Sequence, residues 1–131
     1  MRLFLLDAGG AGLVFAALII FMIIAITTEA ITMLLMKYNK VGKAFLDSFL
    51  ANIASLAVGF VLFTILGTVF YITESIILTW LILYVLTVAV EFLVLYLLNR
   101  THPRNKTLLT SAVMNIVSYI ILYLFVEGIQ I

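Results

Sequence analysis

The sequence contains no cysteine, a single proline and few charged residues. Only 10% of its 131 residues carry a charge, whereas 66% are apolar. The absence of cysteine excludes a disulfide framework and thiolate metal ligands. The scarcity of charge excludes a water-soluble domain of this size, because such a domain needs a polar surface. We therefore expect an integral membrane protein of the plasma or inner membrane, with the lipid bilayer as its first partner.

Recognisable catalytic motifs are also lacking. The chain has no Glu-x-x-His pair, no His-Glu-x-x-His, no Gly-x-Ser-x-Gly and no glycine-rich phosphate loop. Its one histidine, His102, stands alone beside Pro103 and is interpreted as a solvated loop residue, since one histidine makes no metal site. We predict no enzyme activity, no metal and no other cofactor. An intramembrane enzyme ranks third among the functional interpretations, and no nucleic acid partner is expected.

Four long apolar runs account for most of the chain, and they cover residues 12–36, 44–71, 76–98 and 107–126. Each reaches the roughly 20 residues that an α-helix needs to cross a bilayer, and none has proline in its interior. The first run is too long for the apolar region of a signal peptide, which is about 7 to 15 residues. The sequence thus predicts an all-α fold: one transmembrane four-helix bundle, a single domain over residues 1–131.

The basic residues predict the orientation. They cluster in the connections 37–43 and 99–106, whereas Arg2 alone lies on the other side, together with Asp7, Glu74 and Glu127. Lysine and arginine are enriched in cytoplasmic loops of membrane proteins. Both basic loops are therefore expected in the cytoplasm and both termini outside.

The two halves of the chain resemble each other at polar positions. Residues 48–55 and 111–118 share the pattern S-x-x-x-N-I-x-S, and each is preceded by one glutamate inside a span, Glu29 or Glu91. The glutamate-to-asparagine separations are 23 and 24 residues. Apolar bias does not supply matches between polar residues inside spans, where such residues are rare. We infer a parallel internal repeat of two helical hairpins, related by a pseudo-twofold axis along the membrane normal.

These polar residues are also expected at one depth. Glu29 and Glu91 precede the next basic loop residue by 8 and 9 positions, and both asparagines follow the last loop lysine by 9. At 1.5 Å per residue, all four lie roughly 12 to 14 Å inside the cytoplasmic boundary. The serines share one helical stripe with the asparagines, and Gly59 continues that stripe and is expected to permit close helix approach. The predicted site comprises Glu29, Asn52, Glu91, Asn115, Ser48, Ser55, Ser111 and Ser118.

Two interpretations of this polar layer stay open. A charge at the bilayer centre costs at least about 2.5 to 3.5 kcal/mol, so the glutamates should face the bundle interior. There they either join helices, with each hydrogen bond contributing about 0.6 to 2 kcal/mol, or bind a proton or a hard cation. The first role suits a structural subunit or assembly factor of a larger membrane complex. The second suits a small transporter or channel that works as a homo-oligomer.

Asp47 is interpreted separately, as an interfacial capping residue at a helix start.

Overall fold

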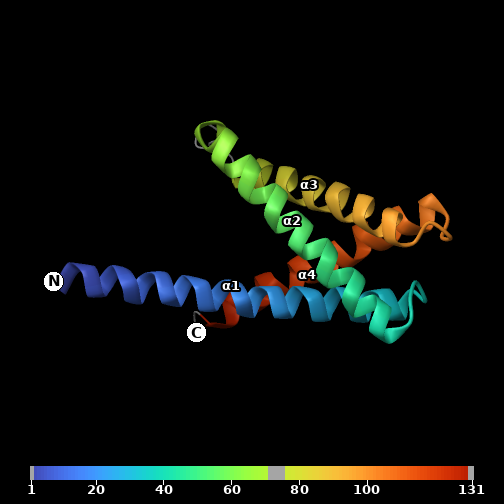
Figure 1. The fold of residues 1–131 in the computed structure, drawn as a ribbon, viewed down its shortest axis with the longest axis horizontal. Helices are drawn as coiled ribbons and strands as arrows, with labels where there is room; N and C mark the ends of the chain where they lie inside the picture. Colours follow the sequence, from blue (N-terminus) through green and yellow to red (C-terminus); the bar gives the residue numbers. More distant parts are fainter. Residues whose placement is uncertain (1, 71–75, 130–131) are drawn as a thin grey trace.

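All regular structure in the described part of the chain is α-helical, in agreement with the predicted all-α class. The computed structural model describes residues 2–70 and 76–129, with side chains for residues 12, 15–62, 64, 78, 81–125 and 128. Its helices are α1 (Arg2–Leu35), α2 (Val41–Phe70), α3 (Ile76–Leu98) and α4 (Arg104–Ile129) (Figure 1). The expected end of the second span at Tyr71 lies outside the described residues. So do Glu74 and the side chains of Arg2, Asp7 and Glu127.

Each helix contains a segment long and apolar enough to cross a bilayer. These segments are Phe15–Leu35, Val41–Leu62, Leu81–Leu98 and Arg104–Phe125. Large apolar side chains such as Phe15, Leu35 and Phe60 are exposed on the helix surfaces. Continuous exposure of this kind suits a hydrocarbon solvent and not water. The composition-based prediction of a membrane protein is thus supported by four helices of sufficient length and hydropathy.

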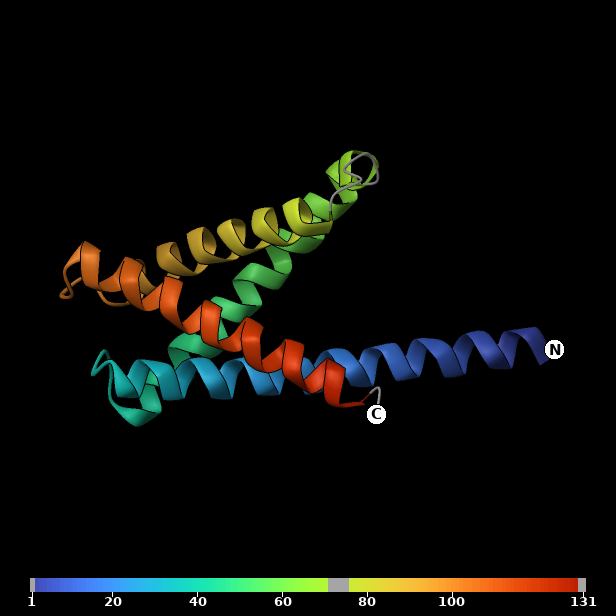
Figure 2. The ribbon, with the colours of Figure 1, turned by 180° about the vertical axis from the view of Figure 1, so that it is seen from behind.

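The helices form a ring in which each contacts two others. α1 packs against α2 and α4, and α3 packs against α2 and α4, whereas the diagonal pairs make no contact over the described residues. Figures 1 and 2 show the connections 36–40 and 99–103 at one end of the molecule and the chain ends toward the other. Away from the basic loops, α2 and α3 diverge together from α1 and α4. The bundle is closed at the loop end and splayed at the other.

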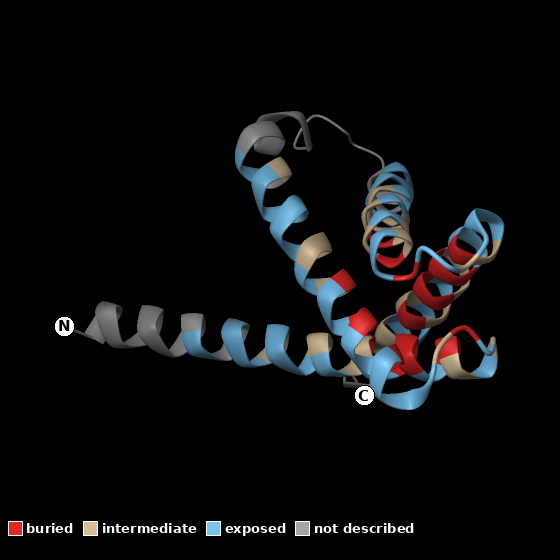
Figure 3. Ribbon diagram, turned by 45° about the vertical axis from the view of Figure 1, so that its right-hand side comes forward, coloured by how far each residue is buried: buried red, intermediate tan, exposed pale blue. Residues whose placement is uncertain are grey.

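Buried residues gather at the loop end (Figure 3). The apolar core there consists of Ala30, Met33, Tyr38, Ala44, Leu95 and Met114. Small residues at two of the α1 and α2 positions let the helices approach closely, which is how helices associate when lipid removes the hydrophobic driving force. The close-packed core therefore lies between the polar layer and the basic loops.

The turn after α1 is a Schellman motif. Lys37 adopts a left-handed conformation, with φ of 50°. The N–H of Tyr38 donates to the oxygen of Met33 at 2.8 Å, and the N–H of Lys37 donates to that of Leu34 at 3.0 Å. These bonds satisfy carbonyls that a helix end leaves free, and the motif commonly brings two apolar side chains into contact. Here it directs Tyr38 into the core beside Met33.

The expectation for Gly59 is wrong. A Cβ atom at Gly59 would meet nothing within 4 Å, so no helix approaches it closely. The reason is the splay of the bundle, because Gly59 lies beyond the layer in which the helices pack together. Ser48, Asn52 and Ser55 of this helical stripe therefore contact other helices, whereas Gly59 at its end does not.

Candidate functional site: an intramembrane polar layer and its cavity

The first glutamate–asparagine pair joins α1 to α2. Glu29 is 1% exposed, and its Oε2 accepts hydrogen bonds from Asn52 Nδ2 and, at 2.8 Å, from Ser48 Oγ. Ser48 Oγ also lies 3.2 Å from the backbone oxygen of Ile26, one turn before Glu29. Asn52 Nδ2 donates in addition to the backbone oxygen of Ser48 at 3.0 Å. The carboxyl group of Glu29 is thus held by two side chains of α2.

The second pair joins α3 to α4 through corresponding atoms. Glu91 is fully buried, and its Oε2 accepts a hydrogen bond from Asn115 Nδ2. Ser111 Oγ donates to the backbone oxygen of Val88 at 2.9 Å, and Asn115 Nδ2 donates to that of Ser111 at 2.9 Å. In both pairs the serine therefore bonds the carbonyl three positions before the glutamate. Ser111, unlike Ser48, has no bond to the neighbouring carboxyl group among those the structure describes.

Two further serines connect the pairs to each other. Ser55 on α2 donates to Glu91 Oε1 on α3 at 3.3 Å. Ser118 on α4 lies close to the Glu29 carboxyl group of α1, and its Oγ donates to the backbone oxygen of Asn115 at 3.3 Å. Each glutamate thus contacts an asparagine of the helix that follows it in sequence and a serine of its other neighbour. The four helices meet in one network of side chains.

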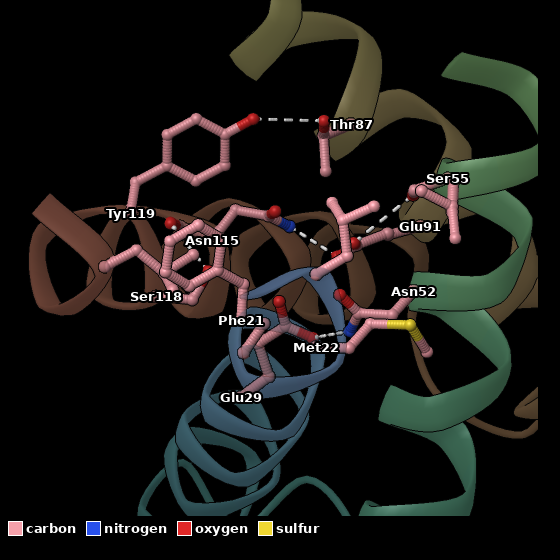
Figure 4. Close-up of a pocket in the computed structure, with 14 residues that line it drawn as sticks. Phe21, Met22, Glu29, Asn52, Ser55, Thr87, Glu91, Asn115, Ser118 and Tyr119 are labelled. Atoms are coloured by element: carbon pink, nitrogen blue, oxygen red, sulfur yellow. Dashed lines mark hydrogen bonds between the residues drawn. The ribbon is translucent and has the colours of Figure 1, made fainter. Parts of the chain in front are cut away.

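Six of the eight predicted site residues line a single cavity of about 290 Å³. The six are Glu29, Asn52, Ser55, Glu91, Asn115 and Ser118, and Figure 4 shows them projecting from four helices toward one space. Ser48 and Ser111 lie behind the layer and do not line the cavity. Their role is to fasten each glutamate-bearing helix to its neighbour.

The cavity lies on one side of the polar layer only. Its other lining residues precede the glutamates on α1 and α3 or follow the asparagines on α2 and α4, and they are Leu18, Phe21, Met22, Ala25, Leu56, Thr87, Tyr119 and Leu122. All of these positions are farther from the basic loops than the glutamates and asparagines are. The buried core fills the opposite side of the layer. The site is consequently closed toward the basic loops and faces the splayed end.

One buried acceptor in the cavity is free. Asn115 is 1% exposed, and its Oδ1 has no hydrogen-bond partner among the described residues. The contact with the backbone oxygen of Ser111 determines the orientation of the Asn115 amide. Because that backbone oxygen can only accept a hydrogen bond, the amide nitrogen and not Oδ1 must face it. A buried polar atom without a partner costs about 1 to 3 kcal/mol, so such atoms are rare in native proteins and call for an explanation.

The halves differ in the wall of the cavity, which sequence reasoning missed. Thr87 Oγ1 and the Tyr119 hydroxyl are 3.3 Å apart, and the Tyr84 hydroxyl donates to the backbone oxygen of Ala112 at 3.1 Å. Positions corresponding to Thr87 and Tyr119 in the first half are Ala25 and Leu56. The α3–α4 wall is therefore the more polar one. The repeat alignment contained this difference, because it pairs a threonine with an alanine and a tyrosine with a leucine.

The capping interpretation of Asp47 is wrong. α2 begins at Val41, so Asp47 lies in its second turn, and the side chain is 1% exposed. Its carboxylate accepts hydrogen bonds from Asn39 Nδ2 at 2.6 Å, Asn99 Nδ2 at 2.7 Å and Lys43 Nζ at 3.1 Å. Asp47 therefore joins both basic loops at the closed end of the bundle.

Tyr38 and His102 complete this loop-end cluster. The Tyr38 hydroxyl lies 3.0 Å from Thr107 Oγ1, and the His102 ring packs on the Tyr38 ring with centroids 4.5 Å apart. Burial, and to a lesser extent Asp47, raise the pKa of Tyr38, while Thr107 opposes them. The phenol therefore stays neutral at physiological pH. His102 is half-buried on an aromatic ring and is not the solvated loop residue that was expected.

The serines behind the layer provide a test of its contribution to packing. S111A removes one interhelical hydrogen bond, to the oxygen of Val88, without touching the cavity. We expect it to lower the free energy of unfolding by about 0.6 to 1.7 kcal/mol, the range for such bonds in membrane proteins. Unfolding in detergent, followed by circular dichroism, measures this. T64A is the comparison, because the exposed Thr64 hydroxyl donates to the backbone oxygen of Val61 within α2. An S111A protein as stable as wild type would contradict the packing role.

The donor set of the site is carboxyl, amide and hydroxyl groups. In the part of the chain that the structure describes, no three histidine, cysteine, aspartate or glutamate side chains are grouped as metal ligands. The site is therefore suited to protons and to cations that bind oxygen.

Compared with protein-family models, with curated proteins and with solved structures, the chain matches none of them.

Proposed function

We propose that this protein is a small membrane transporter or channel whose glutamate–asparagine layer binds a proton or a cation. The observation that carries the proposal is the placement of two buried glutamates, Glu29 and Glu91, at the base of one cavity within the apolar part of the bundle. Ionisable residues inside membrane spans are costly, and they mark ion and substrate pathways or proton relays. Two neighbouring carboxylates in a low-dielectric site favour a bound cation or proton, because both cannot easily stay ionised.

The one-sided cavity supports a carrier with alternating access. If the basic loops are cytoplasmic and both termini outside, the cavity faces out and the core with the Asp47 cluster closes the cytoplasmic end. Passage to the cytoplasm then requires α1 and α2 to separate from α3 and α4 there. Breaking the Asp47–Asn99 bond between α2 and the end of α3 is one part of that step. Rocking of two repeats about a central site is the usual way in which transporters do this.

The repeat of two hairpins is part of the proposal. It is supported by the matching bonds of Ser48 and Ser111 to carbonyls one turn before each glutamate. It is supported further by two reciprocal contacts between the halves, since Ser55 of the first half contacts Glu91 and Ser118 of the second half contacts Glu29. A pseudo-twofold axis along the membrane normal generates this pattern from one hairpin. Four helices alone enclose little volume, so we also propose a homo-oligomer.

Reconstitution tests the proposed function. The purified chain in liposomes should dissipate an imposed pH gradient, either by conducting protons or by exchanging protons for a cation. The rate should be proportional to the protein content. A fluorescent pH indicator inside the liposomes reports both. The proposed transport would be contradicted if liposomes with correctly folded protein showed the same proton flux, and the same flux of every cation tried, as protein-free liposomes.

A structural subunit or assembly factor is the second candidate function. It is favoured by the interhelical hydrogen bonds of both glutamates, because these bonds stabilise the packing of the helices whether or not the layer binds a ligand. Copurification separates the candidates. A chain that is isolated stably by itself, and that is stabilised by a ligand, supports transport. A chain recovered only with other membrane subunits supports the structural role.

A further inference from the structure

The cavity is much larger than a proton or a bare metal ion requires. Its volume of about 290 Å³ is close to the lower end of small-molecule pockets, roughly 300 to 1,000 Å³. A single water occupies about 30 Å³ of liquid, so the space holds a molecule of several heavy atoms. Size therefore points to an organic ligand.

The lining divides into a polar base and an apolar wall. The base holds the two carboxyl groups and the two amides, whereas Leu18, Phe21, Met22, Leu56 and Leu122 surround the space farther from the basic loops. Phe21 and Met22 line the same cavity as Glu29 and Asn52 (Figure 4). A hydrated metal ion gains nothing from such a wall, because apolar groups cannot replace its water ligands. An organic cation with an apolar body gains from both parts.

The amide orientations also disfavour a metal ion. Asn52 and Asn115 direct their nitrogens, not their oxygens, at the carboxyl groups, and the same nitrogens face the backbone oxygens of Ser48 and Ser111. The amide oxygens therefore do not join the carboxyl oxygens as ligands of one metal ion. The acceptor without a partner is Oδ1 of Asn115, a buried side chain that belongs to the cavity lining. An N–H donor that also carries positive charge would satisfy it and the two carboxyl groups together.

We propose that the cavity binds a primary ammonium compound with a small apolar body, its three N–H groups directed at Glu29, Glu91 and Asn115 Oδ1 and its body against the apolar wall. This rests on the proposed function and names the class of its substrate. Tyr119 and Phe21 add aromatic surface to the wall, which attracts an organic cation. An ammonium group that replaces a proton on Glu29 or Glu91 releases that proton, so the proposal couples entry of the ligand to exit of a proton.

Binding to the full chain in detergent tests the proposal. Benzylammonium is the probe, and benzyltrimethylammonium, which has no N–H group, is the matched compound. Isothermal titration calorimetry at constant ionic strength should give an affinity for benzylammonium about tenfold or more above that for benzyltrimethylammonium, the usual effect of losing a hydrogen bond to a charged group. Potassium chloride should produce no comparable heat.

Variants separate the two parts of the site. N115L removes the free acceptor and should weaken benzylammonium by about tenfold. I116A, next in sequence but 46% exposed on the outer face, should bind as wild type does. If N115L fails to fold, L122W provides the second test, because it fills the apolar part of the cavity. It should abolish benzylammonium binding and leave methylammonium binding unchanged.

Two outcomes would overturn the inference. One is equal affinity for benzylammonium and its trimethyl analogue, and the other is unchanged benzylammonium binding in N115L or L122W. Proton or alkali-cation flux in liposomes would survive either outcome, and the proposed function with it. Absence of all cation binding together with absence of all flux would instead contradict both this inference and the proposed function.

Discussion

The double variant E29Q/E91Q should reduce proton- or cation-dependent flux to the level of protein-free liposomes. Glutamine preserves the shape of each side chain and an oxygen that can accept the amide hydrogen bonds from Asn52 and Asn115. It removes both the negative charge and the titratable proton. Flux measured with an internal pH indicator, at equal protein content, gives the result directly.

The single variants and a matched control make this result interpretable. E29Q and E91Q should each retain one carboxyl group in the cavity and lose most but not all of the flux. E127Q makes the same chemical change about three turns beyond Asn115 on α4, and it should transport as wild type does. Full flux through a folded E29Q/E91Q protein would show that the polar layer serves packing and not transport.

D47A should lower the free energy of unfolding by roughly 3 kcal/mol, the largest effect on stability that we expect from one substitution. The carboxylate is 1% exposed and accepts hydrogen bonds from Asn39, Asn99 and Lys43. Its loss leaves the buried amide of Asn99 without this acceptor, at a cost of about 1 to 3 kcal/mol. Removing one member of a buried charged network costs about 3 to 5 kcal/mol. Unfolding in detergent, monitored by circular dichroism, measures the difference.

K43A is the matched control for D47A. It removes the charged partner of the same carboxylate, but the Lys43 side chain is 45% exposed and water replaces it. Ion pairs of this kind contribute about 0 to 1 kcal/mol. The predicted order of stability is therefore wild type, K43A and then D47A. Equal losses for the two variants would mean that Asp47 acts only through Lys43 and does not join the loops.

Sequence reasoning located the polar layer but not its full set of contacts. Counting residues from the basic loops put Glu29, Asn52, Glu91 and Asn115 at one depth, and the structure brings all four to one cavity. Their mutual orientation depends on the rotation of each helix about its axis. Hydropathy does not determine that rotation, because these helices are apolar on nearly every side.

The loop-end cluster shows why other residues were missed. Asp47, Asn39 and Asn99 lie on α2 and in two different connections, and their contacts span 8 and 52 positions. No periodic pattern links positions so unevenly spaced. Asp47 looked like a helix-start residue because the helix was expected to begin at 44, whereas α2 begins at Val41.

The sequence by itself determined that this protein forms helices long and apolar enough to cross a membrane and that two glutamates lie among their apolar residues. These properties follow from length, composition and spacing along a single segment, so local information is sufficient. Only the tertiary structure decided which side of the polar layer is hollow, that Ser55 and Ser118 reach across to the other half, and that Asn115 keeps a free oxygen. Helix tilt and rotation produce these features, and both arise from packing between segments far apart in the chain.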